Sequence, residues 1–258
     1  MKEFDELVEI VEKLRHPKDG CPWDTKQTSR SLIPNFIEEL HEAIEAIEND
    51  NGEHLSEELG DILLHIVMQA QIAKEETRFD IKTALKKINE KLVRRHPHIF
   101  GNEKISNAEK VKINWEQIKQ KEKKETRNSV LDGIPKTMPA LIIAQRLQDK
   151  ASSVGFDWQT TTPIFAKLKE EIDEFMVAFE QNNLPEMKAE LGDILFVLVN
   201  LARKLGFDAE SSIKLTNNKF ERRFKKIEQF LKNNNEDIYQ TNLERLDELW
   251  NLAKKDEK

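Results

Sequence analysis

Two acidic stretches decide the fold of this chain: EELHE at residues 38–42 and, after a short polar break, EELGD at residues 57–61. Side chains three or four residues apart lie on one face of a helix, so Glu39 should lie beside Glu42, and Glu58 beside Asp61. Two helices joined by so short a break are antiparallel neighbours. Four convergent carboxylates without a cysteine suit a hard cation, Mg²⁺ or Mn²⁺.

The same pattern occurs a second time, as EEIDE at residues 170–174 and ELGD at residues 190–193. Each acid of the second copy follows its counterpart by 132 residues: Glu171 follows Glu39, Glu174 follows Glu42, Glu190 follows Glu58 and Asp193 follows Asp61. The tryptophans repeat at an offset of 135, from Trp23 to Trp158 and from Trp115 to Trp250. The chain is therefore predicted to be a tandem duplication.

The repeat sets the expected domain organisation. We expect an N-terminal domain at residues 1–120, a charged linker at 121–138 and a C-terminal domain at 139–258. Charged residues make up 34% of the 258 residues, whereas Gly and Pro number only 8 each. Scarce turn residues and abundant helix formers predict an all-α protein, with each domain a helical bundle.

Charge and composition exclude several classes of protein. The formal net charge of −7 argues against a general nucleic-acid or membrane-surface binder, which needs an excess of Lys and Arg. The longest apolar runs are far shorter than a membrane span. One cysteine, Cys21, cannot form an internal disulfide, and the first residues lack an apolar signal core. We therefore expect a cytoplasmic protein without a membrane role.

The acidic residues admit two interpretations. In so charged a chain, a single glutamate is best explained as part of a solvated helix face. Glu58 and Asp61, however, lie within an apolar run where an unpaired carboxylate is costly. Glu190 and Asp193 lie within an apolar run in the same way. The repetition favours a metal site in each copy.

Basic and aromatic residues also repeat. Lys91 and Arg95 correspond to Lys219 and Arg223 at an offset of 128, and each pair shares a helix face that could hold phosphate oxygens or form ion pairs with nearby acids. Each copy ends with Trp and Lys four residues apart, Trp115 and Lys119 in the first and Trp250 and Lys254 in the second. Such a pair could stack a base while the lysine meets a phosphate. Trp23 and Trp158 are interpreted as core residues beneath a loop, with substrate contact as the alternative.

On these residues the chain resembles the MazG family of nucleoside triphosphate pyrophosphohydrolases, over essentially its whole length. The two acidic motifs in both copies carry the resemblance, together with residues 20–24, 94–98, 219–223 and 250–254. The resemblance implies a tandem all-α fold and a homodimer. It also implies Mg²⁺-dependent hydrolysis of nucleoside triphosphates, ATP among them, to the monophosphate and pyrophosphate, in a house-cleaning role on canonical or altered ribo- or deoxynucleotides.

The resemblance also assigns roles position by position. It makes Glu171, Glu174, Glu190 and Asp193 the metal ligands and Glu170 a supporting acid that orients the water. Catalysis then involves Glu170, Glu171, Lys219 and Arg223, and the nucleotide contacts are Lys219, Arg223, Trp250 and Lys254. The first copy retains the same residue types, with Glu39, Glu42, Glu58 and Asp61 as its metal candidates beside Glu38.

Two other functions remain open from the sequence. Glu38-x-x-His41 imitates the Glu-x-x-His pattern of di-iron carboxylate bundles, although Asp173 stands where the second copy would need a histidine. A helical dimer that senses or sequesters nucleotides is the non-enzymatic alternative. If the protein is a hydrolase, we expect the second copy to carry most of the turnover, because Pro97 ends the helix soon after Arg95.

Overall fold

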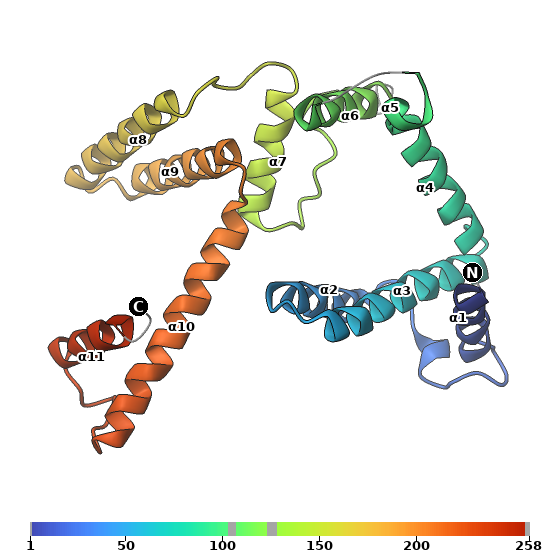
Figure 1. The fold of residues 1–258 in the computed structure, drawn as a ribbon, viewed down its shortest axis with the longest axis horizontal. Coiled ribbons are helices and arrows are strands. Elements are labelled where there is room, and N and C mark those ends of the chain that lie inside the picture. The colour runs from blue at the N-terminus through green and yellow to red at the C-terminus, as the bar shows by residue number, and fades with distance from the viewer. Residues whose placement is uncertain (1, 103–106, 123–127, 256–258) are drawn as a thin grey trace. The chain divides into compact units, whose positions relative to one another are not determined.

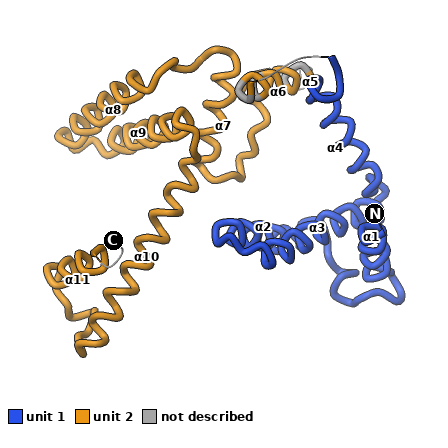
Figure 2. Tube along the Cα trace, viewed as in Figure 1, with its two compact units in different colours: residues 1–106 blue, residues 107–258 orange. Residues whose placement is uncertain are grey.

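The computed structural model describes residues 2–102, 107–122 and 128–255, and every regular element within these ranges is a helix. The predicted all-α fold is therefore confirmed. The chain divides into two compact units, residues 1–106 and 107–258 (Figures 1 and 2). The boundaries at 1–120 and 139–258 remain a prediction from the repeat, and residues 123–127 of the expected linker lie outside the described residues. None of the described helices is long and apolar enough to cross a bilayer.

The first unit is built on a helical hairpin. Its elements are α1 (Lys2–Leu14), the 3₁₀ turn η1 (Asp24–Lys26), α2 (Ile33–Glu48), α3 (Gly52–Glu75), α4 (Ile81–Arg95) and α5 (Pro97–Phe100). The polar break predicted between the two acidic helices is the turn between α2 and α3, where the Asn51 side chain accepts a hydrogen bond from the backbone N–H of His54 at 3.2 Å. Such N-caps satisfy a donor that the helix leaves unpaired. Helix α1 packs on α3.

A small apolar core joins α1 to the hairpin. Its fully buried members are Val11, Leu32, Val67, Met68 and Ile72, and Phe4, Leu7, Val8 and Leu64 pack around them. Burying an aliphatic side chain of this size contributes about 1.5–3 kcal/mol. This core holds α1 firmly against α3 and fills the space between them.

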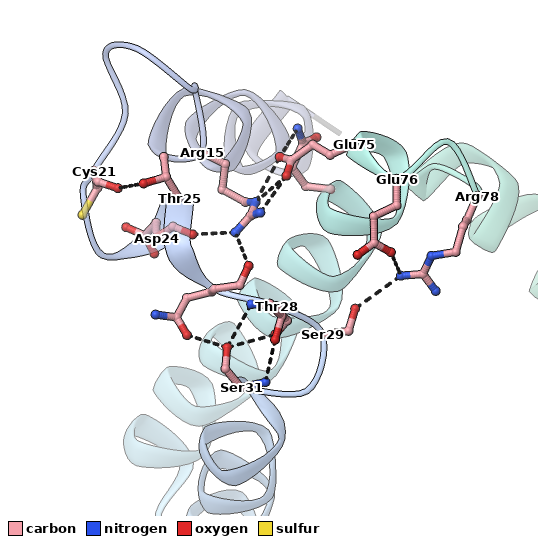
Figure 3. Close-up of polar contacts among 12 residues, drawn as sticks. Arg15, Cys21, Asp24, Thr25, Thr28, Ser29, Ser31, Glu75, Glu76 and Arg78 are labelled. Atoms are coloured by element: carbon pink, nitrogen blue, oxygen red, sulfur yellow. Dashed lines mark hydrogen bonds and ion pairs between the residues drawn. The ribbon is translucent and has the colours of Figure 1, made fainter.

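A buried arginine fastens the loop that follows α1 (Figure 3). Arg15 donates from Nη2 to the carboxylate of Glu75 at 2.6 Å, and its Nη1 donates to the backbone carbonyls of Asp24 and Gln27. The hydrogen bond from Arg15 holds the pKa of Glu75 below its usual range. Gly20 is required in this loop because a Cβ there would lie 2.4 Å from the carbonyl oxygen of His16.

The second unit repeats the hairpin and extends it. Its helices are α6 (Ala108–Glu122), α7 (Ala140–Ser152), α8 (Thr162–Glu180), α9 (Leu184–Leu205), α10 (Ala209–Asn233) and α11 (Leu243–Lys255). Helices α8 and α9 form the hairpin, α7 packs on α9 and α10, and α11 packs on α10 (Figure 1). Ile227, Leu231 and Leu249 form the core between α10 and α11.

In this unit an aspartate fastens the loop that follows α7. Asp157 accepts a hydrogen bond from Arg203 Nη2 at 2.6 Å and one from Lys204 Nζ at 3.4 Å. Burial alone would raise the pKa of Asp157, but the two cations outweigh it and lower the pKa. The interpretation of the loop tryptophans as core residues is wrong, because Trp23 is 57% exposed and Trp158 is 37% exposed.

Candidate metal and nucleotide site

Two antiparallel helices bring the second acidic cluster together. Helix α8 supplies Glu171 and Glu174 and helix α9 supplies Glu190, and one carboxylate oxygen from each lies within 4.8 Å of the others. Glu171 is buried, Glu190 is half-buried and Glu174 is exposed. Asp193, one turn after Glu190, lies outside this group of three, although its charge acts on Glu190. The structure thus brings three of the four predicted ligands together and places the fourth beside them.

The cluster has the electrostatics of a cation site. The pKa of Glu174 is raised by burial and then by the negative charge of Glu171, and the pKa of Glu190 is raised by burial and then by the charges of Glu174, Glu171 and Asp193. These carboxylates repel one another, so a bound cation would stabilise their ionised forms. Carboxylate oxygens from two helices are the donors that Mg²⁺ and Mn²⁺ prefer. The residues therefore fit the predicted metal.

A lysine that the sequence interpretation missed lies against this cluster. Lys167 Nζ lies 2.7 Å from Glu171 Oε1 and 2.6 Å from Glu170 Oε1. These two hydrogen bonds raise the pKa of Lys167. The contact could have been predicted from the spacing of four residues between Lys167 and Glu171, since such pairs share a helix face.

The first unit contains an equivalent cluster. Glu39 on α2 and Glu58 and Asp61 on α3 each offer one oxygen within 4.8 Å of the others. Glu58 is 5% exposed, and its Oε2 has no hydrogen-bond partner within the described part of the chain. The pKa of Glu39 is raised by burial and then by the charges of Asp61, Glu42 and Glu58. A buried carboxylate oxygen without a partner is the feature that a cation would satisfy.

Two histidines adjoin the first cluster, and the sequence interpretation did not include them. His54 Nε2 lies 2.9 Å from Glu58 Oε1, and His65 Nε2 lies 3.9 Å from Glu39 Oε1. Their counterparts at the offset of 132 are Glu186 and Val197, so the two copies differ here. His41, which the di-iron interpretation needs as a ligand, is exposed and is not a member of either group of three.

The predicted nucleotide contacts lie on the other helix pair of the second unit. The guanidinium carbon of Arg223 on α10 lies 5.7 Å from the ring centroid of Trp250 on α11, a cation–π contact. Phe220 packs on the same tryptophan with 5.2 Å between ring centroids. Lys219 and Lys254 are both exposed. This group lies on α10 and α11, whereas the acidic cluster lies on α8 and α9.

The counterparts in the first copy are arranged differently. Helix α4 ends at Arg95, as Pro97 predicts, and Arg95 is 7% exposed. Trp115 and Lys119 lie on α6, which belongs to the second unit, and Lys119 Nζ lies 3.0 Å from Glu116. The other oxygen of Glu116 lies 3.9 Å from Lys150 Nζ on α7.

Comparison with known proteins identifies the family. The model of the MazG nucleotide pyrophosphohydrolase domain matches residues 27–100 and 159–227, once in each copy. The chain is 41% identical over 100% of its length to nucleoside triphosphate pyrophosphohydrolase of Escherichia coli strain K12, of which 99% is covered. It is 44% identical over 97% of its length to the nucleoside triphosphate pyrophosphohydrolase/pyrophosphatase MazG of Thermotoga maritima, of which 95% is covered.

A third relative is longer than this chain. The uncharacterized protein YabN of Bacillus subtilis is 45% identical over 99% of the chain, which covers 52% of YabN. The chain belongs to the MazG nucleotide pyrophosphohydrolase family. The resemblance seen in the sequence, the tandem all-α fold and the assignment to a class of hydrolases are thereby confirmed.

Proposed function

We propose that this protein hydrolyses nucleoside triphosphates to nucleoside monophosphates and pyrophosphate with Mg²⁺, and that Mn²⁺ can replace it. The observation that carries the proposal is the convergence of three carboxylates from two antiparallel helices in each copy. Two of the three correspond at the offset of 132, Glu39 with Glu171 and Glu58 with Glu190. The names of the E. coli and T. maritima relatives support the reaction class. Substrates would include ATP and altered ribo- or deoxynucleotides, which suits a house-cleaning role in the cytoplasm.

In this proposal Glu171, Glu174, Glu190 and Asp193 hold the cation in the second unit. Glu39, Glu42, Glu58 and Asp61 are the corresponding candidates in the first. When bound, the cation would polarise the α-phosphoryl group and offset negative charge on the departing pyrophosphate.

Glu170 and Lys167, which precede Glu171 on α8, would position and deprotonate the attacking water. Water adds to the α-phosphorus, the bond from that phosphorus to the bridging oxygen of the β-phosphate breaks, and pyrophosphate leaves with the electron pair. Glu170 accepts from Lys167 at Oε1, which leaves its Oε2 to orient the water and to accept its proton. Lys167 also holds Glu171 in place, because its Nζ lies 2.7 Å from Glu171 Oε1.

The remaining predicted contacts fix the nucleotide. Lys219 and Arg223 offer two cations to phosphate oxygens, and Lys254 lies four residues after Trp250. Within one chain these residues lie on α10 and α11, whereas the acids lie on α8 and α9. In the proposed homodimer, a second chain supplies the basic helix pair.

Apolar side chains on the hairpin support the same assembly. Several residues of α8 and α9 are 41–49% exposed in the single chain, and water contact on so many of them is unfavourable. These residues are Ile172, Met176, Leu191, Leu195, Phe196 and Leu198. We expect sedimentation to report a dimer at micromolar concentration, and an active monomer would contradict the proposal.

One screen tests the function. Purified protein is incubated with canonical and altered nucleoside triphosphates, and pyrophosphate, orthophosphate and monophosphate are measured separately. We expect pyrophosphate and monophosphate in equal amounts, with no turnover after chelation of Mg²⁺. Orthophosphate as the primary product would place attack at the terminal phosphorus, and binding without turnover would favour a nucleotide sensor.

A further inference from the structure

A cavity of about 630 Å³ opens beside the second acidic cluster, between α7, the loop before α8, and helices α8 and α9. Glu171 and Asp193 line it at one side, so it adjoins the carboxylates directly. Its other walls are mainly apolar and aromatic, and they include Phe156, Trp158, Phe196 and Val197. Pockets that bind small molecules have this size and this mixture of apolar wall and few polar groups.

Two polar groups in the wall lack partners. Gln148 is 5% exposed, and its Nε2 donates to the backbone carbonyl of Phe196 at 2.8 Å, which fixes the orientation of the amide. Its Oε1 has no hydrogen-bond partner among the described residues, and neither has the Nε of Arg203, whose other two nitrogens donate to Asp157. Two residues of the wall therefore have one unpaired acceptor and one unpaired donor, and unpaired buried groups of this kind are costly.

We propose that this cavity seats the nucleobase of the substrate, an inference that rests on the proposed function. Trp158 offers a ring face for stacking, and stacking tolerates any base. A base presents an N–H donor and an acceptor on one edge, and these match the unpaired Oε1 of Gln148 and the unpaired Nε of Arg203. The triphosphate then extends from the cavity toward Glu171 and Asp193.

In the first unit, the positions that correspond to two residues of this cavity hold side chains packed in the core. At the offset of 132, Leu64 and Met68 stand where the second unit has Phe196 and Asn200, and both pack into the core of α1 and α3. Met68 is 4% exposed, as expected of a side chain that fills its space. Trp250 is a weaker candidate for a base platform because Phe220 and Arg223 already pack on it.

The test uses two variants of the full-length protein and one matched control. Trp158→Ala removes the stacking face, and Asn200→Met places in the cavity the residue that fills the first unit. Trp23→Ala removes the corresponding exposed tryptophan of the first unit. We expect Trp158→Ala to raise KM for nucleoside triphosphates roughly fivefold to a hundredfold with kcat nearly unchanged, and Asn200→Met to act in the same direction. Trp23→Ala should leave KM unchanged.

Inorganic tripolyphosphate, which has phosphates and no base, separates the cavity from the acidic cluster. Its inhibition constant against nucleotide turnover should be the same in the wild type and both variants. An equal loss for tripolyphosphate and nucleotide, or an unchanged KM in Trp158→Ala, would overturn the inference. Binding of AMP and UMP without metal, measured by calorimetry, tests the cavity even if the wild type hydrolyses no triphosphate. A wild type that binds AMP and UMP but hydrolyses no triphosphate would contradict the proposed function alone. Equal binding of AMP and UMP by the wild type and Trp158→Ala would contradict the cavity inference alone.

Discussion

The two units hold similar acidic clusters on the same kind of helix hairpin, but the residues packed beside the clusters differ. In the second unit a cavity lined by Trp158 and Asn200 adjoins the carboxylates. In the first, the equivalent position to Asn200 is Met68, which is buried in a packed core. The duplication therefore kept the acidic residues of the two copies similar, whereas the residues packed beside them diverged.

The largest expected effect comes from deleting acids in one unit at a time. Replacing Glu174 and Asp193 together by Ala should lower turnover by on the order of a thousandfold, because electrostatic stabilisation of the reacting phosphoryl group is lost. The matched double variant at Glu42 and Asp61 should keep most of the activity. Steady-state rates on ATP test this, with circular dichroism to confirm that both variants stay folded. A reversed outcome would assign the chemistry to the first unit.

Substitutions on the basic helices α10 and α4 should also affect the second unit more than the first, by less than the loss of the acids. Lys219→Ala removes an exposed cation from the middle of α10 and should raise KM roughly tenfold to a hundredfold, the usual effect of losing a charged hydrogen bond to phosphate. Lys91→Ala, its counterpart on α4, should change KM less than twofold. Equal effects of the two substitutions would mean that both units bind substrate.

The loops that follow α1 and α7 are fastened by ion pairs of opposite polarity. In the first unit the cation, Arg15, lies before the loop and its partner Glu75 ends α3. In the second the anion, Asp157, lies in the loop and its partner Arg203 lies near the end of α9. The two copies thus make the same connection, from the loop region to the second helix of the hairpin, with exchanged charges.

These pairs predict how stability depends on pH. Glu75 and Asp157 both have a lowered pKa in the folded protein, so each stabilises its unit fully above its unfolded pKa near 4 and loses that contribution as pH falls through the folded pKa. At pH 7, Asp157→Asn should cost about 2 kcal/mol and Glu75→Gln about 1 kcal/mol, the latter smaller because Glu75 is 36% exposed and screened by water.

Hydrogen exchange at pH 7, and urea unfolding at both pH 7 and pH 3, test this prediction by measuring the free energy of unfolding of each variant and the wild type. The difference between each variant and the wild type should shrink at pH 3, because the carboxyl of the unfolded wild-type chain is then largely protonated and folding has to release that proton. A difference that stays constant from pH 7 to pH 3 would show that shape, not charge, accounts for the loss.

The sequence predicted the hairpins and the acidic clusters because both follow from local rules. Helical spacing places Glu171 beside Glu174, and a short break makes the next helix antiparallel, so that Glu190 arrives opposite. The cavity could not be predicted in this way. Whether position 68 or 200 closes a space depends on how α1 or α7 packs on the hairpin. That packing joins residues far apart in the sequence, such as Gln148 and Phe196.

Partners of the acids were missed for a related reason. Lys167 and His54 each precede a glutamate by four residues, a spacing that was visible, but the chain contains many such pairs. Only burial singles these out, since Glu171 and Glu58 are both 5% exposed. The exposed position of Trp158 likewise depends on where its loop crosses the hairpin.

The smallest effect that we predict concerns one glycine in each hairpin. Gly60 and Gly192 stand 132 residues apart inside α3 and α9, and an added Cβ would meet no atom within 4 Å in the single chain. Glycine inside a helix is less stable than alanine by about 1 kcal/mol. In a single chain, Gly60→Ala and Gly192→Ala should therefore both raise the free energy of unfolding by up to about 1 kcal/mol.

In the proposed homodimer, a helix of the second chain packed closely over one glycine would turn that gain into a loss. Urea unfolding at two protein concentrations distinguishes the cases. Equal gains at both sites and both concentrations would place neither glycine at the dimer interface, whereas a concentration-dependent loss at one site would identify the hairpin that forms it.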